Sequence, residues 1–429
     1  MESCRPSDAS GPPPVRLHAL GWLAVTCLAG VLLQMLQLFP RLSVPLAPLT
    51  YGRWYPVHAD TALYGWCAVP LVGLLLHWYP EDSDMFGGIL ASRTCLAAWS
   101  LALAAGAASW LGGGSGSKPF MEWSGWTIPL LPLAMLALWV VLAGRCENSR
   151  GRLAPGALAA RWLLLAALLP VPFIFIHAAS PAVYPAVNPD SGGATGTSLL
   201  GSNLGLIAIY AAAPILLGLP REPRRSSRRR VLVPWAILAV MAAVFAAAPH
   251  GDVSNHQLSQ VILLALPLAW APLTWTLFRS YLWPDAARPW LAAAFAWWCL
   301  LLVTGWIGFL PGLGERFKFT QMLVAHAHLA MAACLSSAGW ALLLGLDPNR
   351  APGRGSFAAW QAGVTVHIGA TVLAGLREIA QPDALFVGDS LIRLAWFTRL
   401  AAGLLMAAVA LVWLHAAIVR PKSPVLRSS

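Results

Sequence analysis

Twelve apolar stretches, each long enough to cross a lipid bilayer as a helix, occupy the chain almost from end to end. A bilayer-spanning helix needs roughly 20 apolar residues, because backbone polar groups in lipid must find their partners inside the helix itself. Only 10% of the 429 residues are charged, against about 25% in soluble domains. The sequence therefore predicts an all-α polytopic membrane protein, with spans at 17–40, 56–79, 88–112, 125–144, 157–179, 197–219, 231–250, 256–278, 287–310, 319–346, 357–376 and 391–419.

The basic residues indicate how these spans are oriented. If the N-terminus is cytoplasmic, the cytoplasmic segments hold most of the 28 Lys and Arg residues, as the positive-inside rule requires. We therefore expect a multi-pass protein of the cell inner membrane with both termini cytoplasmic. The expected organisation is a cytoplasmic tail at 1–16, a membrane domain at 17–420 and a second cytoplasmic tail at 421–429.

The net charge of +11 does not by itself indicate a nucleic-acid partner. Its basic residues lie in short loops between apolar stretches, where they act as topology signals, so the expected partner is the lipid bilayer and not nucleic acid. The seven Cys form no CxxC or CxxCH motif, which argues against a zinc ribbon and a c-type haem attachment.

Four histidines are predicted to share one layer near the outer side of the membrane. His58 lies near the outer end of the second span, His326 and His328 lie in the tenth, and His250 closes the seventh. Ionisable side chains inside a membrane are rare and usually functional, although a single His is more often a hydrogen-bonded structural residue. His77, His367 and His415 are isolated, and we interpret them as structural.

The His326-x-His328 spacing constrains what these two residues can bind. Residues two apart on an α-helix point about 200° apart, so the two rings face nearly opposite directions and serve different metals. An imidazole from the second span could complete a six-coordinate haem iron with one of them. Arg53 and Arg399, on the same side, are candidate partners for haem propionates. For either Arg alone, ordinary snorkelling to the membrane surface is an equally good explanation.

Together these segments resemble subunit I of the haem–copper oxidases. Within that family they look most like the cbb(3)-type cytochrome c oxidase catalytic subunit, whose relatives include the nitric oxide reductases. The likeness covers most of the chain in topology and is concentrated in four segments: 52–58 (GRWYPVH), 247–250 (AAPH), 319–328 (FTQMLVAHAH) and 398–405 (TRLAAGLL).

The resemblance implies a role for each candidate residue. His58 and His328 would be the axial ligands of a low-spin haem b, and His326 the proximal ligand of a high-spin haem. Arg53 and Arg399 would hold propionates. The membrane domain would then bind one or two b-type haems, and its partners would include other respiratory-complex subunits and a cytochrome c-type electron donor.

The copper site of that family is incomplete in this sequence. Ser202 stands before Asn203 where the family has a His, and His250 is followed by Gly251 where the family has a second His. The seventh span also lacks a Tyr. Because copper needs about three nitrogen ligands, the sequence predicts a degenerate site in which His250 is the one remaining ligand position.

Three functions stay open at this point. The first is a subunit I-like protein that transfers electrons in respiration or binds O2 or NO without a normal copper site. The second is an active terminal oxidase or nitric oxide reductase subunit, whose rearranged metal site would recruit His177 or His256 to His250. The third is a haem-free membrane transporter or scaffold. Proton delivery to an oxidase commonly uses buried ionisable groups, and the cytoplasmic halves of the spans hold almost none.

Overall fold

The computed structural model describes residues 14–79, 88–116, 118–180, 182–183, 187–225 and 227–419. Within these ranges the regular structure is helical, apart from two isolated β-bridges. Twelve helices are long and apolar enough to cross a membrane, which confirms the predicted number of spans. The predicted tail at 421–429 and residues 1–13 of the predicted tail at 1–16 lie outside the described residues. The first helix begins at Val15, inside the predicted first tail.

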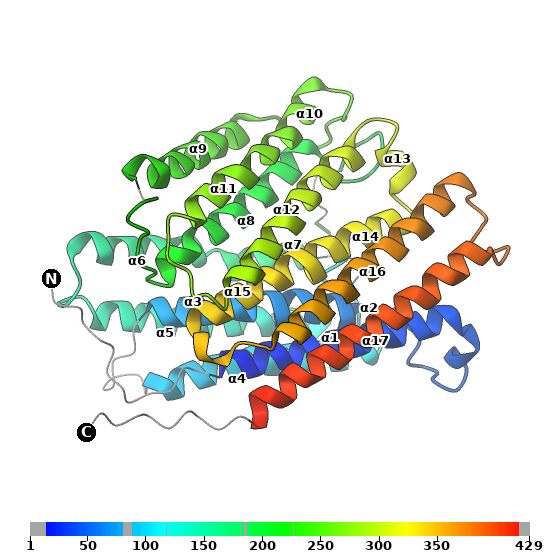
Figure 1. The fold of residues 1–429 in the computed structure, drawn as a ribbon, viewed down its shortest axis with the longest axis horizontal. Coiled ribbons are helices and arrows are strands. Elements are labelled where there is room, and N and C mark those ends of the chain that lie inside the picture. The colour runs from blue at the N-terminus through cyan, green and yellow to red at the C-terminus, as the bar shows by residue number, and fades with distance from the viewer. Residues whose placement is uncertain are drawn as a thin grey trace.

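Eight of the twelve spans are formed by one helix each, and Figure 1 labels them. They are α1 (Val15–Leu38), α4 (Gly88–Leu111), α5 (Leu130–Asn148), α8 (Gly196–Leu216), α9 (Arg228–Ala247), α12 (Arg288–Phe309), α16 (Arg354–Ala380) and α17 (Ser390–Val419).

The other four spans are interrupted. They consist of α2 (Tyr51–Asp60) with α3 (Val69–Trp78), α6 (Pro155–Leu168) with α7 (Val171–Ala179), α10 (Leu258–Ala265) with α11 (Trp270–Phe278), and α14 (Gln321–His328) with α15 (Ser336–Leu346). The α6–α7 and α10–α11 interruptions lie at Pro170 and Pro267, which lack the N–H that an unbroken helix needs. A short helix, α13 (Gly314–Phe317), precedes α14.

Wide π-helical turns join the halves of the second and tenth spans. One runs from Thr61 to Cys67 between α2 and α3, and the other from Leu329 to Leu335 between α14 and α15. Such turns appear mostly as short insertions in α-helices, frequently at functional sites. Here one begins three residues after His58, and the other begins directly after His328.

Two predicted boundaries are wrong in ways that matter for the site. The seventh span ends at Ala247, because the residue before Pro249 is extended, so His250 lies in the following loop and does not close the helix. The eighth span begins at Leu258, which leaves His256 in the same loop.

A tryptophan cluster holds four spans together at one end of the bundle. The ring of Trp340 in α15 lies 5.3 Å from that of Trp290 in α12 and 4.8 Å from that of Trp413 in α17. Trp360 of α16 contacts the same Trp413 ring at 5.2 Å. Such aromatic pairs contribute about 0.5–1.5 kcal/mol each beyond their buried area. The start of α1 and the end of α17 lie at this same end, on the left in Figure 1, and the guanidinium of Arg16 stacks over Trp340.

Candidate functional site

The rings of His58 and His328 lie together inside the bundle, contributed by α2 and α14. Their centroids are 5.9 Å apart and their planes are inclined by 28°. A metal–imidazole bond is about 2.0 Å long, so an iron held by two imidazoles keeps their centroids about 6 Å apart. The observed separation therefore fits an iron between the two rings.

Backbone carbonyls orient both imidazoles. The Nδ1 atom of His58 lies 2.9 Å from the Thr26 carbonyl, and Nδ1 of His328 lies 2.8 Å from the Val324 carbonyl. A carbonyl only accepts, so each Nδ1 carries the proton and each Nε2 keeps its lone pair. Metal-binding histidines are almost always held by such a hydrogen bond.

Gly30 of α1 makes room for the His58 ring. A Cβ atom at this position would lie 2.8 Å from Cε1 and 3.0 Å from Nδ1 of His58, closer than carbon atoms approach. The α1 backbone thus forms a wall against the imidazole that only glycine permits.

His367 is not isolated, contrary to the expectation from the sequence. Its ring, on α16, lies 4.6 Å from that of His328, so His58, His328 and His367 form a row of three imidazoles. Both ring nitrogens of His367 are buried and have no hydrogen-bond partner among the described residues. A buried polar group without a partner is costly, so these nitrogens are unpaired polar atoms beside the His58–His328 pair.

His326 faces away from this row, as the helical spacing predicts. Its Nδ1 lies 3.2 Å from Oγ1 of Thr304 on α12, and a Cβ at Gly305 would lie 3.3 Å from its Cε1. The contacts of His328 are on α2 and α16 instead. The side chains of His326 and His328 therefore point to opposite sides of α14.

Arg399 of α17 is buried close to the imidazole row. It is 5% exposed, and its Nη1 donates to Oε1 of Gln321 at 2.7 Å. Gln321 in turn donates its backbone N–H to Oε2 of Glu378, also at 2.7 Å. The guanidinium is near enough to interact electrostatically with His58 and His328.

Several buried N–H donors at the same end of the bundle as the imidazoles have no acceptor among the described residues. Arg399 Nε is one, and Trp396 Nε1 lies one turn before it on α17. Two more such donors are Nε1 of Trp54 and Nε2 of Gln34. Trp54 precedes His58 by four residues on α2, and Gln34 follows Gly30 by four residues on α1, so the two members of each pair share a helix face. A carboxylate-bearing group bound beside the imidazoles would supply the missing acceptors, so the donor set fits a haem with its propionates.

Arg53 occupies a different position from Arg399. It lies on α2, half-buried, and its Nη1 donates to the Leu111 carbonyl at the end of α4 at 2.8 Å. Its guanidinium also packs against Gly113, whose Cβ would lie 3.2 Å from Nη2. The structure thus places Arg53 near the N-terminal end of the same helix as His58, with one donor nitrogen already used.

The residues at the expected copper positions are scattered. Ser202 is exposed on α8, where its hydroxyl donates to carbonyls of its own helix. His250 is exposed in the loop after α9, with its ring edge-on to Phe245 at 5.1 Å.

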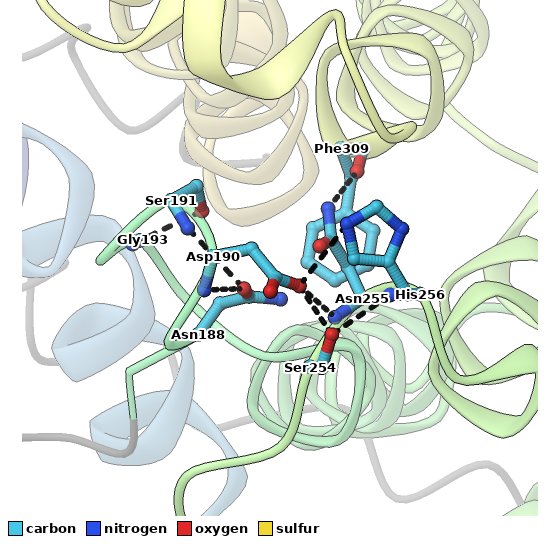
Figure 2. Close-up of polar contacts among 8 residues, drawn as sticks. All are labelled: Asn188, Asp190, Ser191, Gly193, Ser254, Asn255, His256 and Phe309. Carbon is cyan, nitrogen blue, oxygen red and sulfur yellow. Dashed lines mark hydrogen bonds and ion pairs between the residues drawn. The ribbon is translucent and has the colours of Figure 1, made fainter.

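His256 and His177 do not join His250 in a common ligand group. His256 belongs to a loop cluster in which Asp190 accepts from the Ser254 hydroxyl and from the Asn255 N–H at 3.1 Å, with His256 Nε2 3.9 Å away, as Figure 2 shows. Asn255 also donates to the Phe309 carbonyl at 3.0 Å, so the cluster joins two loops to the end of α12. His177 is exposed near the end of α7. In the part of the chain that the structure describes, no three His, Cys, Asp or Glu side chains are grouped to hold a metal ion.

A buried pair of carboxyl groups near His58 was missed by the sequence reasoning. Asp60 of α2 is fully buried, and neither of its carboxyl oxygens has a hydrogen-bond donor among the described residues. Glu122, in the loop before α5, is 3% exposed and interacts with Asp60, and burial raises the pKa of its carboxyl. The available signal was the one acidic residue inside an otherwise apolar second span.

Comparisons with known proteins leave the family open. No model of a known protein family matches the chain, and no curated protein is detectably similar to it. The likeness to subunit I of the haem–copper oxidases therefore depends on the spacing of the histidines and on the four segments that carry it.

Proposed function

We propose that this protein is a haem b-binding membrane protein of the subunit I type, acting in respiratory electron transfer or in binding O2 or NO. His58 and His328 would be the two axial ligands of a low-spin haem. The observation that carries the proposal is their ring separation of 5.9 Å, with both Nδ1 atoms held by backbone carbonyls.

Neighbouring residues orient the imidazoles of His58 and His328 and leave room for them. The carbonyls of Thr26 and Val324 fix the imidazole tautomers and orientations, and the absence of a side chain at Gly30 admits the His58 ring. Arg399 places a buried positive charge near the imidazoles, which would balance the propionates. A haem held there by His58 and His328 would supply one-electron redox chemistry.

His326 supports a second part of the proposal. Its position on the opposite side of α14 would let it hold another haem through one protein ligand, leaving the sixth coordination position free for a diatomic gas. Thr304 would set the orientation of this imidazole through its Nδ1.

The cellular setting is part of the same proposal. Twelve apolar spans support a multi-pass membrane protein, and the distribution of Arg favours the inner membrane with both termini cytoplasmic. Other respiratory subunits and a cytochrome c-type donor would be its partners.

An absorption spectrum of the purified protein tests the proposal directly. We expect sharp α and Soret bands in the dithionite-reduced state that differ from the air-oxidised state, and a pyridine haemochrome of the b type. Carbon monoxide should shift part of the Soret band if His326 holds a five-coordinate haem. A folded protein without haem bands, purified from cells supplied with a haem precursor, would leave a haem-free transporter or scaffold as the better description.

A further inference from the structure

A groove lined by arginines opens at the end of the bundle opposite the histidines. It has a volume of about 620 Å³ and lies between α9 and α11. Four of its lining residues are Arg225, Arg229, Arg230 and Arg279. The others are Ser227, Val233, Pro234, Leu273 and Thr276. The arginines lie at the helix ends and the apolar residues about one turn further into the spans, so the groove is basic outside and apolar inside.

Backbone hydrogen bonds hold the two walls of the groove together. The loop after α8 pairs with the loop after α11 through Glu222 N–H to the Ser280 carbonyl at 2.9 Å and Leu282 N–H to the Pro220 carbonyl at 2.8 Å. The Arg225 carbonyl accepts from Nη1 of Arg230 at 3.2 Å. These bonds fix the backbone of the segments that carry Arg225, Arg230 and Arg279.

The guanidinium groups of this groove have no carboxylate partner among the described residues. Arg228, Arg229 and Arg230 also occupy the first turn of α9, where the helix dipole disfavours cations, and that turn holds no acidic residue. This arrangement costs stability, and an anion in the groove would reduce that cost.

We propose that this groove binds the phosphate headgroup of an anionic phospholipid from the membrane leaflet at the Arg-rich end. A guanidinium group can donate two parallel N–H bonds to two oxygens of one phosphate. Arginines on both α9 and α11 can therefore hold a phosphate headgroup that lies between the two helices. The exposed side chain of Val233 and the half-buried Leu273 offer an apolar track along which an acyl chain runs into the bilayer. Basic pockets between transmembrane helices are a known way for proteins to select anionic lipids.

Native mass spectrometry of the full chain in detergent tests the proposal. The protein is titrated with phosphatidylglycerol or with phosphatidylcholine of the same acyl chains. We expect phosphatidylglycerol to bind preferentially, and the variant R229Q/R230Q/R279Q to lose this preference by about tenfold or more, since each basic residue near an anionic headgroup contributes to binding. The variant R229K/R230K/R279K keeps the charge and should retain most of the preference.

A matched control removes three arginine charges from other places at the Arg-rich end of the bundle. The variant R150Q/R288Q/R354Q should bind phosphatidylglycerol like the unchanged protein. The proposal is overturned if this control loses the preference as strongly as the groove variant, or if the groove variant keeps it. It is also overturned, in favour of a site for a free anion, if inorganic phosphate binds the groove as tightly as the lipid and displaces it.

Discussion

Trp66 donates a hydrogen bond from Nε1 to Oγ of Ser336 at 2.7 Å, eight residues beyond His58 and His328 on their respective spans. The second and tenth spans therefore run parallel and in register from the histidine pair to this bond. In an unbroken α-helix, residues eight apart point about 80° away from each other. The π-helical turns Thr61–Cys67 and Leu329–Leu335 lie at the same level in both spans and reduce the rotation per residue, so both contacts form between the same two faces.

Replacing His58 or His328 with Ala should abolish the low-spin haem spectrum. A six-coordinate iron has only two protein ligands, so losing one removes the low-spin state. Reduced-minus-oxidised spectra of the purified variants provide the measurement. The variants H77A and H415A should keep the spectrum, and a normal low-spin spectrum in H328A would refute the assignment.

Replacing Gly30 with Ala should displace the His58 ring and weaken or abolish the same signal. The added methyl group would lie 2.8 Å from Cε1 of His58, and a packed interior does not absorb such an overlap without moving a side chain. The matched control is G21A on the same helix, where a Cβ meets nothing within 4 Å. G21A should leave the spectrum unchanged and gain up to about 1 kcal/mol in stability. Equal spectra for the two variants would contradict the close packing of Gly30 on the imidazole.

Replacing Arg399 with Gln should lower the midpoint potential of the low-spin haem. Reduction adds an electron, so removing a nearby buried cation makes the reduced state less favourable, by an amount of the order of 50 mV. A redox titration followed at the α band measures the shift. R393Q removes an exposed charge from the same helix and should leave the potential nearly unchanged, because solvent screens that charge. An unaltered potential in R399Q would place Arg399 outside the influence of the haem.

Stability should fall with rising pH because of Glu122. Burial raises the pKa of this carboxyl, so the folded state holds its proton to a higher pH than the unfolded state does. The contribution is fully present below the unfolded pKa and is lost as the pH rises through the folded pKa. Gln resembles the protonated form and has no charge to lose, so E122Q should show a smaller decrease in Tm between about pH 5 and pH 8. Identical pH profiles for the two proteins would argue against a protonated Glu122 in the fold.

Purified protein should contain less than one copper per chain and show little oxygen reduction. The expected positions hold Ser202 and Gly251, and a hydroxyl or a missing side chain is a poor substitute for imidazole. Elemental analysis and oxygen uptake with a reduced electron donor provide the measurements. One copper per chain together with cyanide-sensitive oxygen uptake would contradict this and would indicate a rearranged site around His250.

The sequence alone was enough to predict the twelve spans, because the length and apolarity of a membrane helix are local properties dictated by the bilayer. It was also enough to predict that His326 and His328 face opposite ways, since the helical rotation per residue is a constant of the backbone. The apolar pattern wrongly predicted that His250 closes the seventh span. The helix ends at Ala247, because Ala248, the residue before Pro249, is extended.

Only the tertiary structure decided which distant residues meet. The approach of His367 to His328, the burial of Arg399 beside the imidazoles and the pairing of Asp60 with Glu122 depend on how α2, α14, α16 and α17 pack. No short-range pattern encodes these contacts, because each joins side chains from different helices whose relative rotation is set by the packing of the whole bundle. The π-helical turns also could not be predicted from the sequence. The turn Thr61–Cys67 brings His58 and Trp66 to one face of the second span, and this matters only because the tenth span packs against that face.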